Sequence, residues 1–307
     1  MLKKQKLKWA VNSKVSVIND HNCKNLMGVG LRHPHYRQII EDPPTEKVSW
    51  LEVHPENYFG GGINYKFLEK IREDFPISFH GVGLSLGSAQ PVNVDHVQQL
   101  KKLIDLIEPF RFSDHAAWSM SGNAHLNDLM PLAYTDDNLD NLCRNIDYVQ
   151  NTLGQQILIE NPSTYMRFTQ DEMTEWEFLN SLVSRSECAL LLDINNIVVQ
   201  AKNHGFSAHE YIDNINFNAV KEIHLAGYTK REIEGQTLYL DTHGEKVHKD
   251  VWQLFEYTMS RYSAVHTLIE WDNDIPSLDV LFEEAKKAKS IIDQTKERRC
   301  MQNDAAE

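Results

Sequence analysis

Eight short apolar runs, each ending in polar residues, predict an α/β protein that folds as a single (β/α)8 barrel, the TIM barrel. Amphipathic helical segments lie between these runs, and such alternation with short connections implies parallel strands joined by right-handed crossovers. A length of 307 residues suits one barrel of typical size. The predicted strands are residues 27–31, 48–54, 77–82, 110–115, 156–161, 189–195, 220–225 and 267–271.

The predicted helices are recognised by apolar residues that recur with the period of an α-helix. The pattern is clearest in residues 94–107, 137–153 and 247–262, whose apolar stripes we assign to the core. Shorter or weaker helices are predicted at residues 36–41, 65–74, 172–184, 208–215 and 277–294.

The chain shows no linker rich in Gly, Pro or Ser, so residues 27–294 are expected to form one metal-binding barrel domain. Residues 1–26 are interpreted as a polar N-terminal extension with a possible short strand at 15–18, and residues 295–307 as a frayed C-terminal tail. The main competitor is a doubly wound open sheet. A nucleotide-binding version would need a glycine-rich first turn, and the run Gly60-Gly61-Gly62 lacks that spacing.

The composition narrows the class of function. A formal net charge of −13 argues against an extended nucleic-acid surface, because phosphate contacts need clustered Lys and Arg. The four cysteines show no CxxC spacing, so neither a zinc–thiolate site nor a disulfide framework is indicated, and a reducing cytoplasm is expected. Polar residues interrupt the basic N-terminus, which predicts neither a signal peptide nor a membrane anchor.

Polar residues of a particular kind stand at the ends of the predicted strands. The stretch 223–244 is the fullest example, since it ends a strand with His224 and returns with Asp241 and His243. In a barrel, the carboxyl ends of the strands and the loops after them meet at one mouth. The side chains that this rule brings together are His54, Glu56, His80, Asp114, His115, Glu160, Asn161, Asp193, Asn195, Asn196, His224, Asp241, His243, Glu270 and Asp272.

This collection predicts a metal centre. A single histidine or carboxylate could be a core residue or a turn cap, but many carboxylates in one basin repel each other unless cations lie among them. The set exceeds the three or four protein ligands of one ion, so two or three ions are expected. The alternative interpretation is an acid–base network that holds no metal. Imidazole, carboxylate and the possible amide oxygen of Asn196 suit iron, manganese or zinc.

Several segments together resemble one known family, the multinuclear non-haem iron-dependent oxidative enzymes that include the methanobactin-biosynthesis oxidase. The resemblance covers residues 28–287. It is carried by GVGLRHPHY from Gly28, EVHPENY from Glu52, FHGVGLSLG from Phe79, SDH from Ser113, IENPS from Ile159, LDINN from Leu192, IHLAG from Ile223, DTHG from Asp241 and IEWD from Ile269.

The resemblance implies a barrel with two or three iron ions (Fe2+/Fe3+) that uses dioxygen to modify cysteine, and sometimes other residues, in a ribosomally made precursor peptide. A separate partner protein often presents that peptide. The metal ligands implied are His80, His115, Glu160, Asp193, Asn196, His224, Asp241, His243 and Glu270, with Glu160 as the candidate bridge. Glu56, Asn57 and Asp272 are predicted to support these ligands, although each could instead cap a turn.

Two other classes of function fit the same residues. The arrangement also resembles the wider barrel superfamily of endonuclease IV and xylose isomerase, so a metal-dependent hydrolase or isomerase is the first alternative. Asn196 stands where the endonuclease pattern Asp-x-x-His would place a histidine, which weakens a DNA-repair interpretation. The second alternative is a protein that binds metal without catalysing a reaction.

Overall fold

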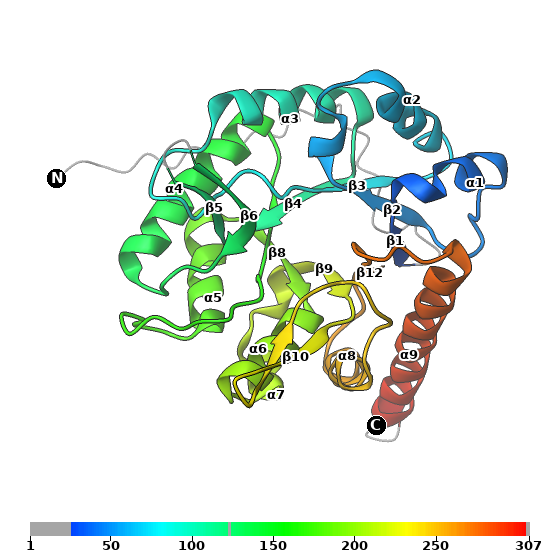
Figure 1. Cartoon of the computed structure of the whole chain (residues 1–307). Coiled ribbons are helices and arrows are strands. Elements are labelled where there is room, and N and C mark those ends of the chain that lie inside the picture. The colour runs from blue at the N-terminus through cyan, green and yellow to red at the C-terminus, as the bar shows by residue number, and fades with distance from the viewer. Residues whose placement is uncertain (1–25, 122–123, 305–307) are drawn as a thin grey trace.

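The computed structural model of the chain describes residues 26–121 and 124–304, so the possible strand at 15–18 lies outside the described residues. The central element is a closed barrel whose strands follow the order β1-β12-β9-β8-β7-β4-β3-β2. Every neighbouring pair within it is parallel. The helices surround this barrel (Figure 1). The predicted TIM barrel is therefore confirmed.

The barrel strands coincide with the eight predicted apolar runs. Most are shorter, because the polar residues that follow leave the ladder to form loops. The strands are β1 Met27–Gly30, β2 Trp50–Val53, β3 Ile77–His80, β4 Arg111–His115, β7 Leu158–Glu160, β8 Ala189–Asp193, β9 Val220–Leu225 and β12 His266–Ile269.

The predicted helices are present with small shifts at their ends. In α3, the predicted apolar stripe from Val97 to Ile107 is buried, and Asn93 caps the helix by accepting hydrogen bonds from two backbone N–H groups. The helices are α1 Tyr36–Glu41, α2 Gly62–Ile71, α3 Val94–Ile107, α4 Asp136–Leu153, α5 Glu175–Ser186, α6 Ile194–His204, α7 Ala208–Asn214, α8 Lys249–Arg261 and α9 Leu278–Asp304. Among the described residues, no helix is long and apolar enough to cross a bilayer.

Helix α6 was not predicted. Its first seven residues, Ile194 to Gln200, are all buried although Asn195, Asn196 and Gln200 among them are polar, so burial in this helix does not follow the apolar pattern of the sequence. It begins directly after β8, where Asp193 Oδ1 accepts a 2.6 Å hydrogen bond from the backbone N–H of Asn196. The predicted strand 189–195 was therefore too long. Its last two residues belong to a helix.

The C-terminal segment also differs from the prediction. A frayed tail was expected from Thr295, but α9 continues to Asp304. Thr295 is buried and its hydroxyl donates to the carbonyl of Ile291 at 2.8 Å. The side chain of Arg298 pairs with Glu256 of α8 at 2.9 Å. Contacts with the rest of the barrel thus keep these residues helical.

Two antiparallel hairpins extend from the barrel, and neither was predicted. One pairs β5 Trp118–Ser121 with β6 Ala124–Met130 after β4, and the other pairs β10 Thr229–Ile233 with β11 Gln236–Leu240 after β9. The second hairpin turns at Glu234 and Gly235, both of which have positive φ. Both hairpins follow the carboxyl ends of barrel strands, where Figure 1 shows β5–β6 and β10.

The amino-terminal end of the barrel is filled by Trp50. Its ring makes edge contacts with Phe110 and His266, at centroid distances of 5.5 and 5.9 Å. Gly28 on the neighbouring strand leaves room for it, because a Cβ there would lie 2.3 Å from Trp50 Cε2. Polar groups lie farther along the strands. Glu52, Glu222 and His224 are all fully buried.

Candidate metal centre

A cavity of about 710 Å³ opens at the carboxyl ends of the barrel strands. Most of the predicted site residues line it. They are His54, Glu56, Asn57, His80, His115, Glu160, Asn196, Asp241, His243, Glu270 and Asp272. Five other predicted residues do not line the cavity, but each is buried beside residues that do: Asp114, Asn161, Asp193, Asn195 and His224. The barrel thus brings the predicted set to one mouth.

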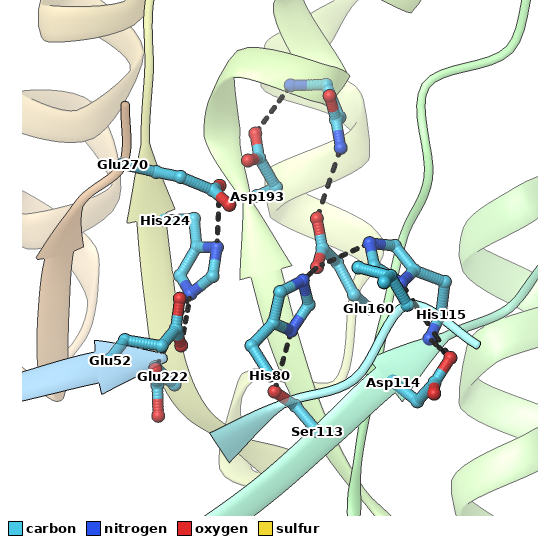
Figure 2. A network of polar contacts seen from close by, with 12 residues as sticks. Glu52, His80, Ser113, Asp114, His115, Glu160, Asp193, Glu222, His224 and Glu270 are labelled. Atoms are coloured by element: carbon cyan, nitrogen blue, oxygen red, sulfur yellow. Dashed lines mark hydrogen bonds and ion pairs between the residues drawn. The ribbon is translucent and has the colours of Figure 1, made fainter. Parts of the chain in front are cut away.

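The first group of possible ligands is His80, His115 and Glu160, from β3, β4 and β7. Glu160 Oε2 lies 3.1 Å from His80 Nε2 and 3.2 Å from His115 Nε2. Figure 2 shows both imidazoles directed at this one carboxylate. Distances of this size separate atoms that share a hydrogen bond, and they also separate the ligand atoms around a single metal ion.

Two neighbours set the orientation of these imidazoles. Ser113 Oγ donates to the carbonyl of Phe79 at 3.3 Å, so it accepts from His80 Nδ1–H at 2.8 Å. Asp114 Oδ1 lies 3.8 Å from His115 Nδ1. Protonation at Nδ1 leaves Nε2 of His80 with its lone pair toward Glu160, as a metal ligand requires.

The electrostatics of this group follow from burial and close charges. Burial lowers the pKa of His115, but the carboxylates of Glu160 and Asp114 outweigh it and raise that pKa to about 9. Burial raises the pKa of Glu160 to about 7, against the influence of His115 and His224. Without a cation, the group therefore holds protons that a metal ion would displace.

The second group lies deeper, where Glu160 meets Asp193 of β8 and His224 of β9. Glu270 follows β12 and faces the same histidine, with its Oε2 3.0 Å from His224 Nδ1. Burial, followed by the nearby carboxylates of Glu160 and Asp241, raises the pKa of Asp193 well above its usual value. Four side chains from four strand ends thus converge (Figure 2).

The third group is formed by Asp241 and His243, in the loop after β11. His243 Nε2 lies 2.5 Å from Asp241 Oδ1, and its Nδ1 lies 3.4 Å from Glu270 Oε2 and 3.1 Å from Asp272 Oδ2. His243 has a φ of 46°, a left-handed conformation that costs energy for a non-glycine residue. Asn195 donates to Asp241 Oδ1 at 2.7 Å and fixes that carboxylate.

Several buried atoms lack a hydrogen-bond partner of good geometry, and they provide a test of whether metal ions fit here. They include Glu160 Oε2, Asp193 Oδ2, Asn196 Oδ1 and His243 Nε2, all of which belong to the predicted ligand set. Leaving such atoms unpaired is costly, whereas bound cations would satisfy them. The donors are imidazole, carboxylate and amide groups, so the described residues fit a cluster of iron, manganese or zinc ions.

The three residues predicted to support the ligands have different surroundings. Asp272 contacts Arg32, and His243 Nδ1 lies near its other oxygen. Glu56 Oε1 accepts from the backbone N–H groups of Val82 and Gly83 at 3.1 Å, so it holds the loop after β3. Asn57 is exposed at the rim of the cavity.

Four residues that contact predicted site residues were not themselves among the sequence candidates. Ser113 binds His80, Arg32 binds Asp272, and Glu52 and Glu222 face His224. Glu222 had a detectable signal, because it stands two residues before His224 and must point to the same side of the strand. Ser113 and Arg32 gave no signal, since neither residue type marks a metal site.

The fold and the site define a class, a TIM barrel whose mouth gathers residues that could hold metal ions. Solved structures of this fold include D-psicose 3-epimerase from Clostridium cellulolyticum, with a TM-score of 0.57 and 10% identity over 88% of this chain and 98% of that one. Endonuclease IV from Thermus thermophilus has a TM-score of 0.53 and 13% identity, over 89% and 99% of the two chains. These similarities concern the fold alone.

Over residues 26–293 the sequence matches the family of the RiPP precursor modification enzymes MbnB/TglH/ChrH, and the protein belongs to this family. RiPPs are ribosomally made, post-translationally modified peptides, so the family consists of enzymes that modify a precursor peptide. A UPF0276 protein of Vibrio vulnificus (strain YJ016) is 45% identical over 267 residues, 87% of this chain and 91% of its own. A UPF0276 protein of Acaryochloris marina is 47% identical over 265 residues, 86% of this chain and 94% of its own.

Proposed function

We propose that the protein is a multinuclear non-haem iron oxidase that uses dioxygen to modify cysteine, or another residue, in a ribosomally made precursor peptide. One observation carries the proposal. The possible ligand groups share members, with Glu160 in one group with His80 and His115 and in another with Asp193 and His224. A shared carboxylate is the arrangement that bridges neighbouring ions, and family membership supplies the peptide substrate.

The chain's own residues would hold the ions in overlapping sets. His80, His115 and Glu160 form one set, and Asp193, His243 and Glu270 form another, with His224 between them. Asn196 and Asp241 complete the centre on the side of α6 and β11. Bound iron would supply the redox chemistry that couples reduction of dioxygen to oxidation of the peptide thiol.

The surrounding residues would bind and orient the peptide. The cavity is large enough for a side chain with part of its backbone, and the β5–β6 hairpin contributes residues 126–129 to its wall. Ser163 and Tyr165 also line the cavity, and both hold Asp241. The hydroxyl of Ser163 donates to Asp241 Oδ2 at 3.2 Å, and the hydroxyl of Tyr165 accepts from the backbone N–H of Asp241. A partner protein that presents the peptide would act at this open side.

Metal analysis of protein purified without air tests the proposal. We expect two or three irons per chain, together with dioxygen consumption when a cysteine-containing precursor peptide is added. Glu160→Ala should lose most of the iron and all oxygen consumption, because it removes the shared carboxylate. Glu69→Ala, on an exposed position of α2, is the matched control and should behave as wild type.

The rival functions give different results in the same experiment. Zinc or magnesium in place of iron, without oxygen consumption, would favour a hydrolase or isomerase and refute the oxidase. A protein that binds metal but acts on no peptide, and whose cellular role survives the substitution His224→Ala, would be a non-catalytic metal-binding protein.

A further inference from the structure

Two buried glutamates lie beneath the metal centre and converge on one nitrogen of His224. Glu52 of β2 places its Oε2 3.3 Å from His224 Nε2, and Glu222 of β9 places its Oε1 3.5 Å from the same atom. All three side chains are fully buried. Figure 2 shows His224 lying between this pair of glutamates on one side and Glu270 on the other.

The two nitrogens of the imidazole therefore face different chemistry. Nδ1 lies 3.0 Å from Glu270, within the proposed centre, whereas Nε2 faces Glu52 and Glu222. A neutral imidazole carries one proton and one lone pair, so only one of the two nitrogens can ligate a metal. The surroundings of Nε2 decide which nitrogen that is.

Because these groups are buried, the neighbouring side chains determine which nitrogen of His224 carries the proton. Both oxygens of Glu52, both oxygens of Glu222 and His224 Nε2 are buried without a hydrogen-bond partner of good geometry. A proton on Nε2 would give the carboxylate of Glu222 a donor, whereas a lone pair there would face that carboxylate as a second acceptor. Arg111 Nη1, 3.6 Å from Glu222 Oε2, supplies a positive charge on the far side and helps to hold Glu222 in its ionised form.

We propose that Glu52 and Glu222 are positioning residues that keep the proton of His224 on Nε2 and its Nδ1 lone pair directed at the metal. This inference rests on the proposed metal centre. A carboxylate that accepts the outer N–H of a ligating histidine fixes the ring and makes it a stronger donor. The pair would thereby favour the ferric form of the ion bound by His224.

Substitution of each glutamate by glutamine tests this role. Glu52→Gln and Glu222→Gln keep the size of the side chain and replace one carboxyl oxygen, which can accept the proton of His224 Nε2, by an amide NH2 group. We expect each to weaken metal binding by roughly 10–100-fold and to raise the ferric/ferrous potential, because the ring becomes a poorer donor. Glu52→Asp should restore part of both properties and serves as the second variant if a glutamine variant folds poorly.

Glu175→Gln is the matched control, since Glu175 is also buried but contacts Gln200 at 3.0 Å in the helical layer. It should leave both the affinity and the potential unchanged. A direct readout is the tautomer of His224, measured by ¹⁵N NMR on zinc-loaded protein, with the resonance assigned by its shift in Glu52→Gln. We expect a proton on Nε2 and zinc at Nδ1.

Several outcomes would overturn the inference. One is a zinc-bound Nε2, and another is wild-type affinity and potential in both glutamine variants. Loss of one whole metal equivalent in Glu222→Gln, with the remaining ions unaffected, would place a cation between the glutamates instead. These outcomes leave the proposed function intact, whereas a wild-type protein that takes up no metal would remove both proposals.

Discussion

Ser113 shows how an uncharged residue can set the chemistry of a proposed metal ligand. Its hydroxyl has one proton, which it donates to the carbonyl of Phe79 at 3.3 Å. It can then only accept from His80, whose Nδ1 lies 2.8 Å away. The direction of one hydrogen bond thus leaves His80 Nε2 free for a metal ion beside Glu160.

We therefore predict that Ser113→Ala weakens metal binding without replacing any ligand. The buried Nδ1–H of His80 would lose its acceptor, which should lower the free energy of unfolding by about 1–3 kcal/mol. Metal affinity should fall by roughly 10–100-fold, as measured by titration of the metal-free protein. Ser78→Ala is the control, because Ser78 is also buried but its hydroxyl has no partner of good geometry. Equal affinities in the two variants would contradict the role of Ser113.

The convergence of the candidate ligands could be predicted from the sequence, whereas several residues that contact them could not. His80, His115 and Glu160 end predicted strands, so the barrel rule alone brings them together. Glu52 stands two residues before His54, so the alternation of a strand directs both side chains to the same side, but nothing in the sequence identifies His224 as a neighbour of Glu52. Its contact with His224 depends on closure of the barrel, which pairs β2 with β1 and β1 with β12.

For helices and strands, the sequence predicts that an element is present more accurately than it predicts where the element begins and ends. The eight strands were found because buried parallel strands are continuous apolar runs. Helix α6 was missed because it is buried on nearly all sides, and its start depends on the cap that Asp193 provides. The β5–β6 hairpin was missed because β5 has only four residues and the apolar residues of β6 lose their alternation after Leu126, where Leu129 and Met130 are adjacent.

Strand β1 depends on the absence of a side chain at Gly28. A Cβ at this position would lie 2.3 Å from Trp50 Cε2, and the rings of Phe110 and His266 limit the movement of Trp50. We predict that Gly28→Ala lowers the free energy of unfolding by about 1–3 kcal/mol through overpacking, measured by urea denaturation. Gly60→Ala is the control, because a Cβ there meets nothing within 4 Å. Equal stability of the two variants would show that Trp50 can be accommodated elsewhere.

For the whole molecule, the barrel concentrates negative charge in the place where function is proposed. The chain carries a formal charge of −13, and Glu160, Asp193 and Glu270 are buried at a single mouth. Such a basin opposes folding unless protons or cations neutralise it. The stability of the protein and the occupancy of its metal centre should therefore be coupled.

We predict that removing the metal lowers the melting temperature of the whole barrel. An ion that binds only the folded chain at 100 times its Kd adds about 2.7 kcal/mol, and two or three ions add correspondingly more. With an unfolding entropy of about 2.1 cal/mol/K per residue, each kcal/mol corresponds to about 1.5 °C for this chain, so chelation should lower Tm by at least several degrees. Adding iron back without air should restore it, as measured by differential scanning calorimetry.

The size of this metal effect should depend on pH, because protons compete for the same atoms. Burial raises the pKa of Glu160 to about 7, so below that pH the metal-free carboxyl keeps a proton that a metal ion must displace. The difference in Tm between metal-loaded and chelated protein should therefore shrink as the pH falls from 8 to 6. Glu160→Ala should show little difference at either pH, which separates the centre from weak surface binding. A chelated wild type that melts at the same temperature as the loaded one would show that the buried carboxylates are neutralised by protons alone.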